Sequence, residues 1–72
     1  MNRINKINKY VSTFETKRER FIFYKNDLAA VFFKDKFKIY TTEEFYKRSS
    51  VKEQLENTKG KLIIINDLSV II

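Results

Sequence analysis

Residues 21–33 read FIFYKNDLAAVFF, and this stretch decides the fold. Its first four residues are aromatic or β-branched, which favours an extended strand. Asn26 and Asp27 tolerate the positive φ angles of a tight turn, and a second apolar run follows them directly. The stretch therefore predicts a β-hairpin with strands at 21–24 and 28–33.

The hairpin is expected to continue into a third strand at 37–40, after a turn at 34–36. Alternation along this third strand places Phe37 and Ile39 on one face. The opposite face then carries Lys36, Lys38 and Tyr40. The three strands together make a predicted β-meander.

A helix is predicted between Thr41 and Gly60. Thr41 and Glu44 have the spacing of a capping box, and glycine is a common residue just past the end of a helix. Basic residues interrupt the apolar face of this helix, and a second capping-box pattern starts at Ser50. We therefore expect the helix to bend or restart near 49–50.

The first residues leave two interpretations open. Apolar residues follow a helical spacing between Arg3 and Phe14, which predicts a helix. Against this, Asn residues lower the helix propensity, and the segment 10–14 is locally strand-like. The alternative is that 1–19 form a partly flexible basic arm.

The last residues predict one more strand at 61–65, and 68–72 either pair with it as a hairpin or form an irregular extension. The expected fold class is α+β: a small antiparallel sheet, made of the meander plus a C-terminal strand or hairpin, packed with one main helix. An N-terminal helix or arm precedes it. Residues 1–72 are expected to form a single small domain.

A winged-helix-like topology is the alternative. It needs a helix at 28–36 with Asp27 as its N-cap, helices at 3–14 and 42–58, and a C-terminal hairpin as the wing. The meander is preferred because the proposed turn before the last helix lacks the small residues that allow close helix crossing. That last helix, which would be the recognition helix, also has no net charge.

The composition excludes several kinds of catalytic site. The chain has no His and no Cys, which removes Ser-His and Cys-His nucleophiles, Cys-based zinc sites and disulfides. A single Gly excludes the Gly-rich loops that bind nucleotide phosphates. The nine acidic residues are scattered, and turn formation, capping and solvation explain them. We therefore expect a non-enzymatic protein with no catalytic residue, no metal site and no cofactor.

The formal net charge of +6 lies in the first half of the chain. Residues 1–41 contain ten basic and four acidic side chains, whereas residues 42–72 contain five of each. Such asymmetry favours an acidic partner, either nucleic acid or an acidic or nucleic-acid-binding protein. Basic residues that lead directly into an aromatic run suit single-stranded nucleic acid or RNA. The candidate contact residues are Lys17, Arg18, Arg20, Lys34, Lys36 and Lys38.

The C-terminal residues are strongly β-prone and carry little charge. We expect them to form a central strand of the core. The alternative is a sheet edge that pairs with a second copy, giving a homodimer, or with a partner protein. The candidate pairing residues are Leu62, Ile63, Ile64, Ile65, Val70 and Ile71.

No stretch has the length or apolar character of a signal peptide or a membrane span, so we expect a cytoplasmic protein with no membrane partner. In size and composition the chain resembles small phage or mobile-element proteins of AT-rich bacteria, many of which bind and inhibit host or defence proteins. That resemblance includes no diagnostic motif. It implies the alternative function, an inhibitor or modulator that acts by direct protein-protein binding.

Overall fold

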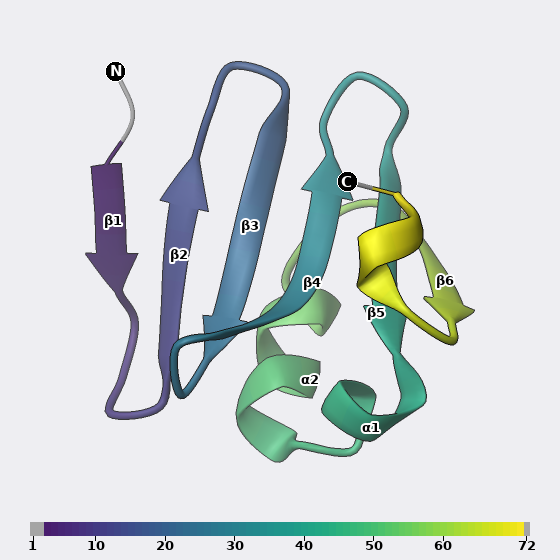
Figure 1. The fold of residues 1–72 in the computed structure, drawn as a ribbon. Helices are drawn as coiled ribbons and strands as arrows, with labels where there is room; N and C mark the ends of the chain where they lie inside the picture. The colour runs from purple at the N-terminus through teal and green to yellow at the C-terminus, as the bar shows by residue number, and fades with distance from the viewer. Residues whose placement is uncertain (1–2, 72) are drawn as a thin grey trace.

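The computed structural model describes the backbone of residues 3–71 and the side chains of residues 7–71. Its centre is one six-stranded sheet in which the order of the strands follows the order of the chain (Figure 1). The strands are β1 (Arg3–Lys6), β2 (Val11–Glu15), β3 (Glu19–Tyr24), β4 (Asp27–Phe33), β5 (Lys38–Thr42) and β6 (Lys61–Ile65). The first five are antiparallel neighbours, and β6 runs parallel to β5.

The connection from β5 to β6 contains two helices, α1 (Glu43–Tyr46) and α2 (Ser49–Glu56). A parallel pair needs such a crossover, because the chain must return to the starting end of the sheet. A short 3-10 helix, η1 (Leu68–Val70), follows β6. The expected α+β class is confirmed, with an antiparallel meander and one main helix packed on it.

The predicted hairpin at the centre of the meander is confirmed. Lys25 and Asn26 connect β3 to β4, and their φ angles are 50° and 68°. Two successive positive φ angles are what a tight hairpin turn requires, since they match the right-handed twist of the flanking strands. The alternative helix over 28–36, on which the winged-helix-like topology depends, is wrong, because residues 28–33 lie in β4.

The strand β4 looked ambiguous in the sequence because it is buried on both faces. Four consecutive residues, 29–32, have at most 9% of their surface exposed. The register explains part of this run, because Ile22 lies opposite Ala30 while Phe23 lies opposite Leu28. The extra residue between them is Ala29, which forms a β-bulge.

The predicted helix from Arg3 to Phe14 is wrong, because β1 and β2 occupy this part of the chain. The Asn8 carboxamide oxygen accepts hydrogen bonds from the backbone N–H groups of Tyr10 and Val11, at 2.8 and 2.9 Å. Asn8 therefore builds a turn in the middle of the supposed helix. In the segment 1–19, which was the alternative arm, β1 and β2 occupy residues 3–6 and 11–15, and residues 1–2 lie outside the described residues.

The third strand begins one residue later than predicted. Phe37 belongs to the turn before β5, where its φ is 53° and 64% of its surface is exposed. Ile39 alone of the predicted pair reaches the core, with 1% exposed. The expectation that the two residues share one face is wrong, because the turn needs a residue in the left-handed region at position 37.

The helical segment restarts where the sequence predicted, with α2 beginning at Ser49. The N-cap of α1 is Thr42 rather than Thr41, because the Thr42 hydroxyl accepts from the Phe45 N–H at 3.4 Å. Thr41 is fully buried in β5 and donates to the Ala29 carbonyl oxygen at 2.8 Å. Gly60 is not the stop signal, since α2 ends at Glu56.

The sheet has a different layer on each face (Figure 1). On one face α1 and α2 cover a core in which Ile22, Ile39, Val51 and Leu55 are at most 4% exposed. On the other face η1 packs against β4 and β5, and its Leu68 is buried.

The C-terminal segment corrects two expectations. Residues 68–70 form η1, so the predicted C-terminal hairpin is wrong and the irregular extension is confirmed. The expected central strand at 61–65 is also wrong, because β6 lies at an edge of the described sheet. Among the described helices, none is long and apolar enough to cross a membrane.

Candidate nucleic-acid interface

Two turns of the meander lie side by side at one end of the sheet (Figure 1). Residues 16–18 connect β2 to β3, and residues 34–37 connect β4 to β5. The Lys34 N–H donates to the Arg18 carbonyl oxygen at 2.8 Å, and the Lys34 ammonium donates to the Thr16 carbonyl oxygen at 3.0 Å. These two bonds join the turns into one surface.

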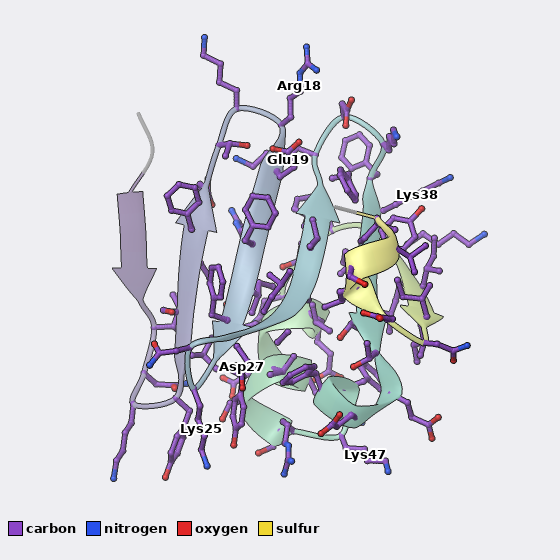
Figure 2. The ribbon with its side chains drawn as sticks, in the orientation of Figure 1. Arg18, Glu19, Lys25, Asp27, Lys38 and Lys47 are labelled. Atoms are coloured by element: carbon purple, nitrogen blue, oxygen red, sulfur yellow. The ribbon has the colours of Figure 1, made fainter. Side chains whose placement is uncertain are left out.

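The first turn is held by Thr16. Its hydroxyl oxygen accepts from the N–H groups of Arg18 and Glu19, at 3.2 and 2.9 Å. Its own N–H donates to the Glu19 carbonyl oxygen at 2.8 Å. Because these bonds fix the backbone, the side chains of Lys17 and Arg18 are exposed at the tip of the turn. Figure 2 shows Arg18 pointing away from the sheet at this end.

Arg20 and Lys34 have a different role from the other candidate residues. Both contact Glu15: the Arg20 guanidinium forms a short ion pair with one carboxylate oxygen, and the Lys34 ammonium lies 2.8 Å from the other. Hydrogen bonds from Lys34 and then Arg20 lower the pKa of the Glu15 carboxyl below its ordinary value of 4.5. The three side chains have a combined charge of +1. The contacts of Arg20 and Lys34 thus stabilise the two joined turns.

The remaining four candidates, Lys17, Arg18, Lys36 and Lys38, are exposed, and the fold brings them to the same end. Figure 2 shows Arg18 and Lys38 there, whereas Lys25 and Lys47 lie at the opposite end. Asp35 is the acidic residue exposed in the second turn.

Sequence reasoning missed two residues of this surface. Lys61 lies opposite Lys38 in the register of β5 and β6, and its N–H donates to the Phe37 carbonyl oxygen at 2.7 Å. This neighbour could not be inferred locally, because the α1–α2 crossover returns the chain to this end. Phe37 was missed because alternation placed it on the same face of the strand as Ile39. We call the resulting surface the basic end, which consists of Lys17, Arg18, Lys36, Phe37, Lys38 and Lys61.

The aromatic run at 21–24 does not form an exposed stacking surface. Ile22 is buried, and the three aromatic residues around it are half-buried. Phe21 packs against Phe14 on the neighbouring strand, with ring centroids 6.3 Å apart. Much of the run therefore serves the packing of the sheet.

The opposite end of the sheet is also basic, and two of its exposed cations contact aromatic rings of the protein. The Lys25 ammonium lies 5.5 Å from the ring centroid of Tyr10 and 5.6 Å from that of Tyr24. The Arg48 guanidinium lies 5.7 Å from the Tyr24 ring. Cation–π contacts of this kind hold a cation in place and satisfy part of its charge. Lys36 at the first end makes a contact of the same kind, 5.5 Å from the centroid of the Phe33 ring, so such contacts do not distinguish the two ends.

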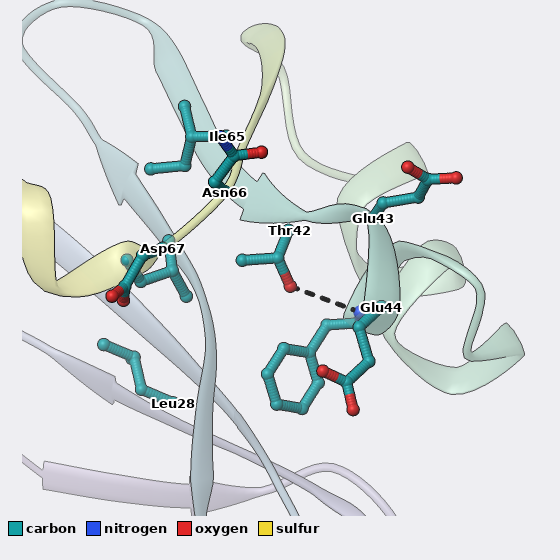
Figure 3. Close-up of a pocket in the computed structure, with 9 residues that line it drawn as sticks. Leu28, Thr42, Glu43, Glu44, Ile65, Asn66 and Asp67 are labelled. Atoms are coloured by element: carbon teal, nitrogen blue, oxygen red, sulfur yellow. Dashed lines mark hydrogen bonds between the residues drawn. The ribbon is translucent and has the colours of Figure 1, made fainter.

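A separate pocket of about 330 Å³ lies between the start of α1 and the segment after β6 (Figure 3). Its acidic residues have structural roles. Glu43 and Glu44 occupy the first turn of α1, where negative charge favours a helix N-terminus. Asp67 caps η1 by accepting from the Ser69 N–H at 3.0 Å, and this bond lowers the pKa of the Asp67 carboxyl. Among the side chains of residues 7–71, no group of three or more acidic residues has an arrangement that could hold a metal ion.

Comparisons with known proteins do not add a family to this description. No protein-family model matches the chain, and neither the curated proteins nor the solved structures searched contain a match. The functional argument therefore depends on the geometry of the basic end.

Proposed function

We propose that the protein is a small non-enzymatic binding protein that contacts nucleic acid, alone or in a nucleoprotein complex, through the basic end. The observation that carries this proposal is the hydrogen bond between Lys34 and Arg18, which joins two basic turns. Cations held close together on a rigid backbone can neutralise successive phosphates and release their counterions. Fixing them in advance also lowers the entropy lost on binding.

The salt dependence of binding tests this proposal. Labelled DNA and RNA oligonucleotides are titrated at several salt concentrations, and fluorescence anisotropy gives the dissociation constant. The double variant Lys17→Gln/Arg18→Gln removes two charges of the basic end. Its salt slope, taken as log K against log salt concentration, should be shallower by about 1.4 for a single strand, from about 0.7 per phosphate contact.

The matched control is Lys47→Gln/Lys52→Gln, which removes the same charge from the exposed surface of α2 and the turn before it. We expect this control to change the slope by less than half as much. Equal slopes for the two double variants would show that overall charge, rather than the basic end, determines binding. No binding of any oligonucleotide at low salt would overturn the proposal.

A second candidate function is direct binding of a protein, as in an inhibitor or modulator of the phage or mobile-element type. The observation that favours it is the edge position of β6, in which Ile64 is 48% exposed. The Lys61 N–H points toward β5, so alternation turns the backbone groups of Leu62 and Ile64 outward. An extended segment of a partner could add a strand there. Of the other candidate pairing residues, Val70 and Ile71 lie beyond this strand.

The two functions are separated by capture from a nuclease-treated lysate. A protein captured by the native chain and lost with Ile64→Lys, but retained with the control Val70→Lys, would support strand addition, because a lysine on the edge opposes pairing. Val70 is a fair control since it is an exposed apolar residue outside β6. If Ile64→Lys captures the same proteins as the native chain, strand addition is excluded. Light scattering shows whether the added strand comes from a second copy.

A further inference from the structure

Given the proposed function, we further propose that the basic end binds single-stranded nucleic acid and that the Phe37 ring stacks on an unpaired base. The proposal depends on three properties of Phe37: its exposure, its backbone conformation and its charged neighbours. The positive φ is uncommon for a bulky residue, and the three properties together favour one kind of ligand.

Neither the exposure of Phe37 nor its backbone conformation is explained by a contribution of this residue to the stability of the fold. Phe37 is 64% exposed and is absent from the hydrophobic core. The Lys36 N–H closes the turn by donating to the Phe33 carbonyl oxygen at 3.3 Å, and Phe37 follows with a φ of 53°. This position favours glycine or asparagine, and a bulky residue in it is strained. Strain at an exposed aromatic residue is typical of a functional site.

The backbone around Phe37 is nevertheless firmly held. Its carbonyl oxygen accepts from the Lys61 N–H at 2.7 Å, which anchors the turn to β6. On the preceding side, the backbone bond from the Lys36 N–H to the Phe33 carbonyl oxygen closes the turn. Phe37 is therefore presented from a fixed backbone, so stacking on it loses little conformational entropy.

The neighbours of Phe37 determine what kind of aromatic contact it makes. Lys36 and Lys38 flank it in the chain, and Lys61 lies beside Lys38 on the next strand. Cations around an exposed ring fit a phosphate backbone whose bases stack on the ring. A duplex keeps its bases paired and stacked on each other, so it offers the phosphates but leaves the ring without a partner. Single strands should therefore bind more tightly than duplexes of the same length.

The chain contains no tryptophan, so Phe37→Trp introduces a single fluorescent reporter at this position. We expect Phe37→Trp to bind single strands about as tightly as the native chain, and its fluorescence to be quenched when a base stacks on the indole. Phe37→Asn keeps a residue that tolerates the backbone conformation but removes the ring. It should weaken single-strand binding roughly 5- to 150-fold, the effect of losing one stacked base.

The experiment compares a single-stranded DNA, a single-stranded RNA and a DNA duplex of equal length at one salt concentration. Val70→Asn, at another exposed apolar residue, is the control and should bind like the native chain. Phe37→Asn should leave duplex binding unchanged, and thermal unfolding verifies that each variant is folded. A preference for one of the two single strands identifies which nucleic acid is bound.

Two results would overturn the stacking proposal while leaving the proposed function intact. One is equal affinity for single strands and duplex that Phe37→Asn does not change. The other is unquenched fluorescence of Phe37→Trp in a saturated complex. If no oligonucleotide binds the native chain, the proposed function itself fails, and the ring would then be available to a protein partner.

Discussion

The N–H of Lys34 donates to the carbonyl oxygen of Arg18 at 2.8 Å, and this bond relates two turns that belong to different hairpins. The Lys34 side chain strengthens the relationship through Thr16 and Glu15. Lys34 therefore supports the basic end without being one of its exposed cations. A substitution of Lys34 should for this reason change the stability of the fold more than the binding of nucleic acid.

Lys34→Gln is expected to lower the free energy of unfolding by about 0.5–1.5 kcal/mol, because it removes an ion pair and a hydrogen bond from a half-buried site. Lys36→Gln should cost much less stability. The order reverses for binding, where Lys36→Gln should reduce the salt slope more than Lys34→Gln. Urea unfolding and anisotropy titrations of the two variants measure both quantities. A larger slope change for Lys34→Gln would place its ammonium on a phosphate.

The ion pairs of Glu15 predict a pH dependence of stability. The folded protein lowers the pKa of Glu15 below 4.5, so the carboxylate stabilises the fold above that pH. The stabilisation is lost as the pH falls through the pKa of the folded state. Glu15→Gln should therefore be less stable than the native chain near pH 7, by about 0.2–1 kcal/mol, and should approach it in acid.

Urea unfolding at several pH values tests this expectation, with Glu53→Gln on the exposed surface of α2 as the control. The control should follow the native curve. If the difference between Glu15→Gln and the native chain stays constant down to pH 2, then the carboxylate of Glu15 is not the source of the pH dependence.

Phe37→Asn is expected to raise the free energy of unfolding by about 0.5–1 kcal/mol, because asparagine adopts a positive φ with less strain than phenylalanine. Little apolar burial is lost, since the residue is 64% exposed. Thermal and urea unfolding should both show the gain. A loss of stability of similar size would mean that the ring contributes to packing, and the strain argument for its function would fail.

The close packing around Gly60 predicts that a larger residue at this position destabilises the fold. A Cβ atom at this position would lie 3.1 Å from Cγ1 of Ile39 and 3.2 Å from Cε1 of Phe32. Both neighbours belong to the core and have little room to move, so Gly60→Ala should destabilise the fold by about 1–3 kcal/mol. Lys59→Ala, at the exposed preceding residue, should stay within about 0.5 kcal/mol of the native chain. Equal unfolding midpoints for the two variants would contradict the close packing.

The local parts of the fold were predictable from the sequence, and the non-local parts were not. The β3–β4 hairpin follows from the turn chemistry of Asn26 and from β-prone residues on both sides. The N-terminal strands were missed because the apolar spacing there happens to fit a helix, while the turn at Asn8 depends on a single side chain. The edge position of β6 depends on the path of the α1–α2 crossover. No local sequence pattern specifies that path.

The candidate site also has features that the local sequence indicates and features that depend on the fold. The structure places Lys17, Arg18 and Lys36 in turns, which the residue types at those positions indicate, while their contact with a partner stays a prediction. The role of Arg20 was not predictable, since its contact with Glu15 depends on the register of β2 and β3. Phe37 was placed on the same face as Ile39 because strand alternation was extended one residue into the turn. A residue with a positive φ breaks that alternation.

Because the order of the strands follows the order of the chain, the sheet can assemble by adding one strand at a time to a growing edge. Each strand from β2 to β5 needs only its predecessor, through a short connection, and such local pairing is the fastest kind of sheet formation. The crossover to β6 is the slower, longer closure. During synthesis, the two turns of the basic end would therefore already be joined when β6 leaves the ribosome. Docking of Lys61 beside Phe37 would then be the last step that completes the surface.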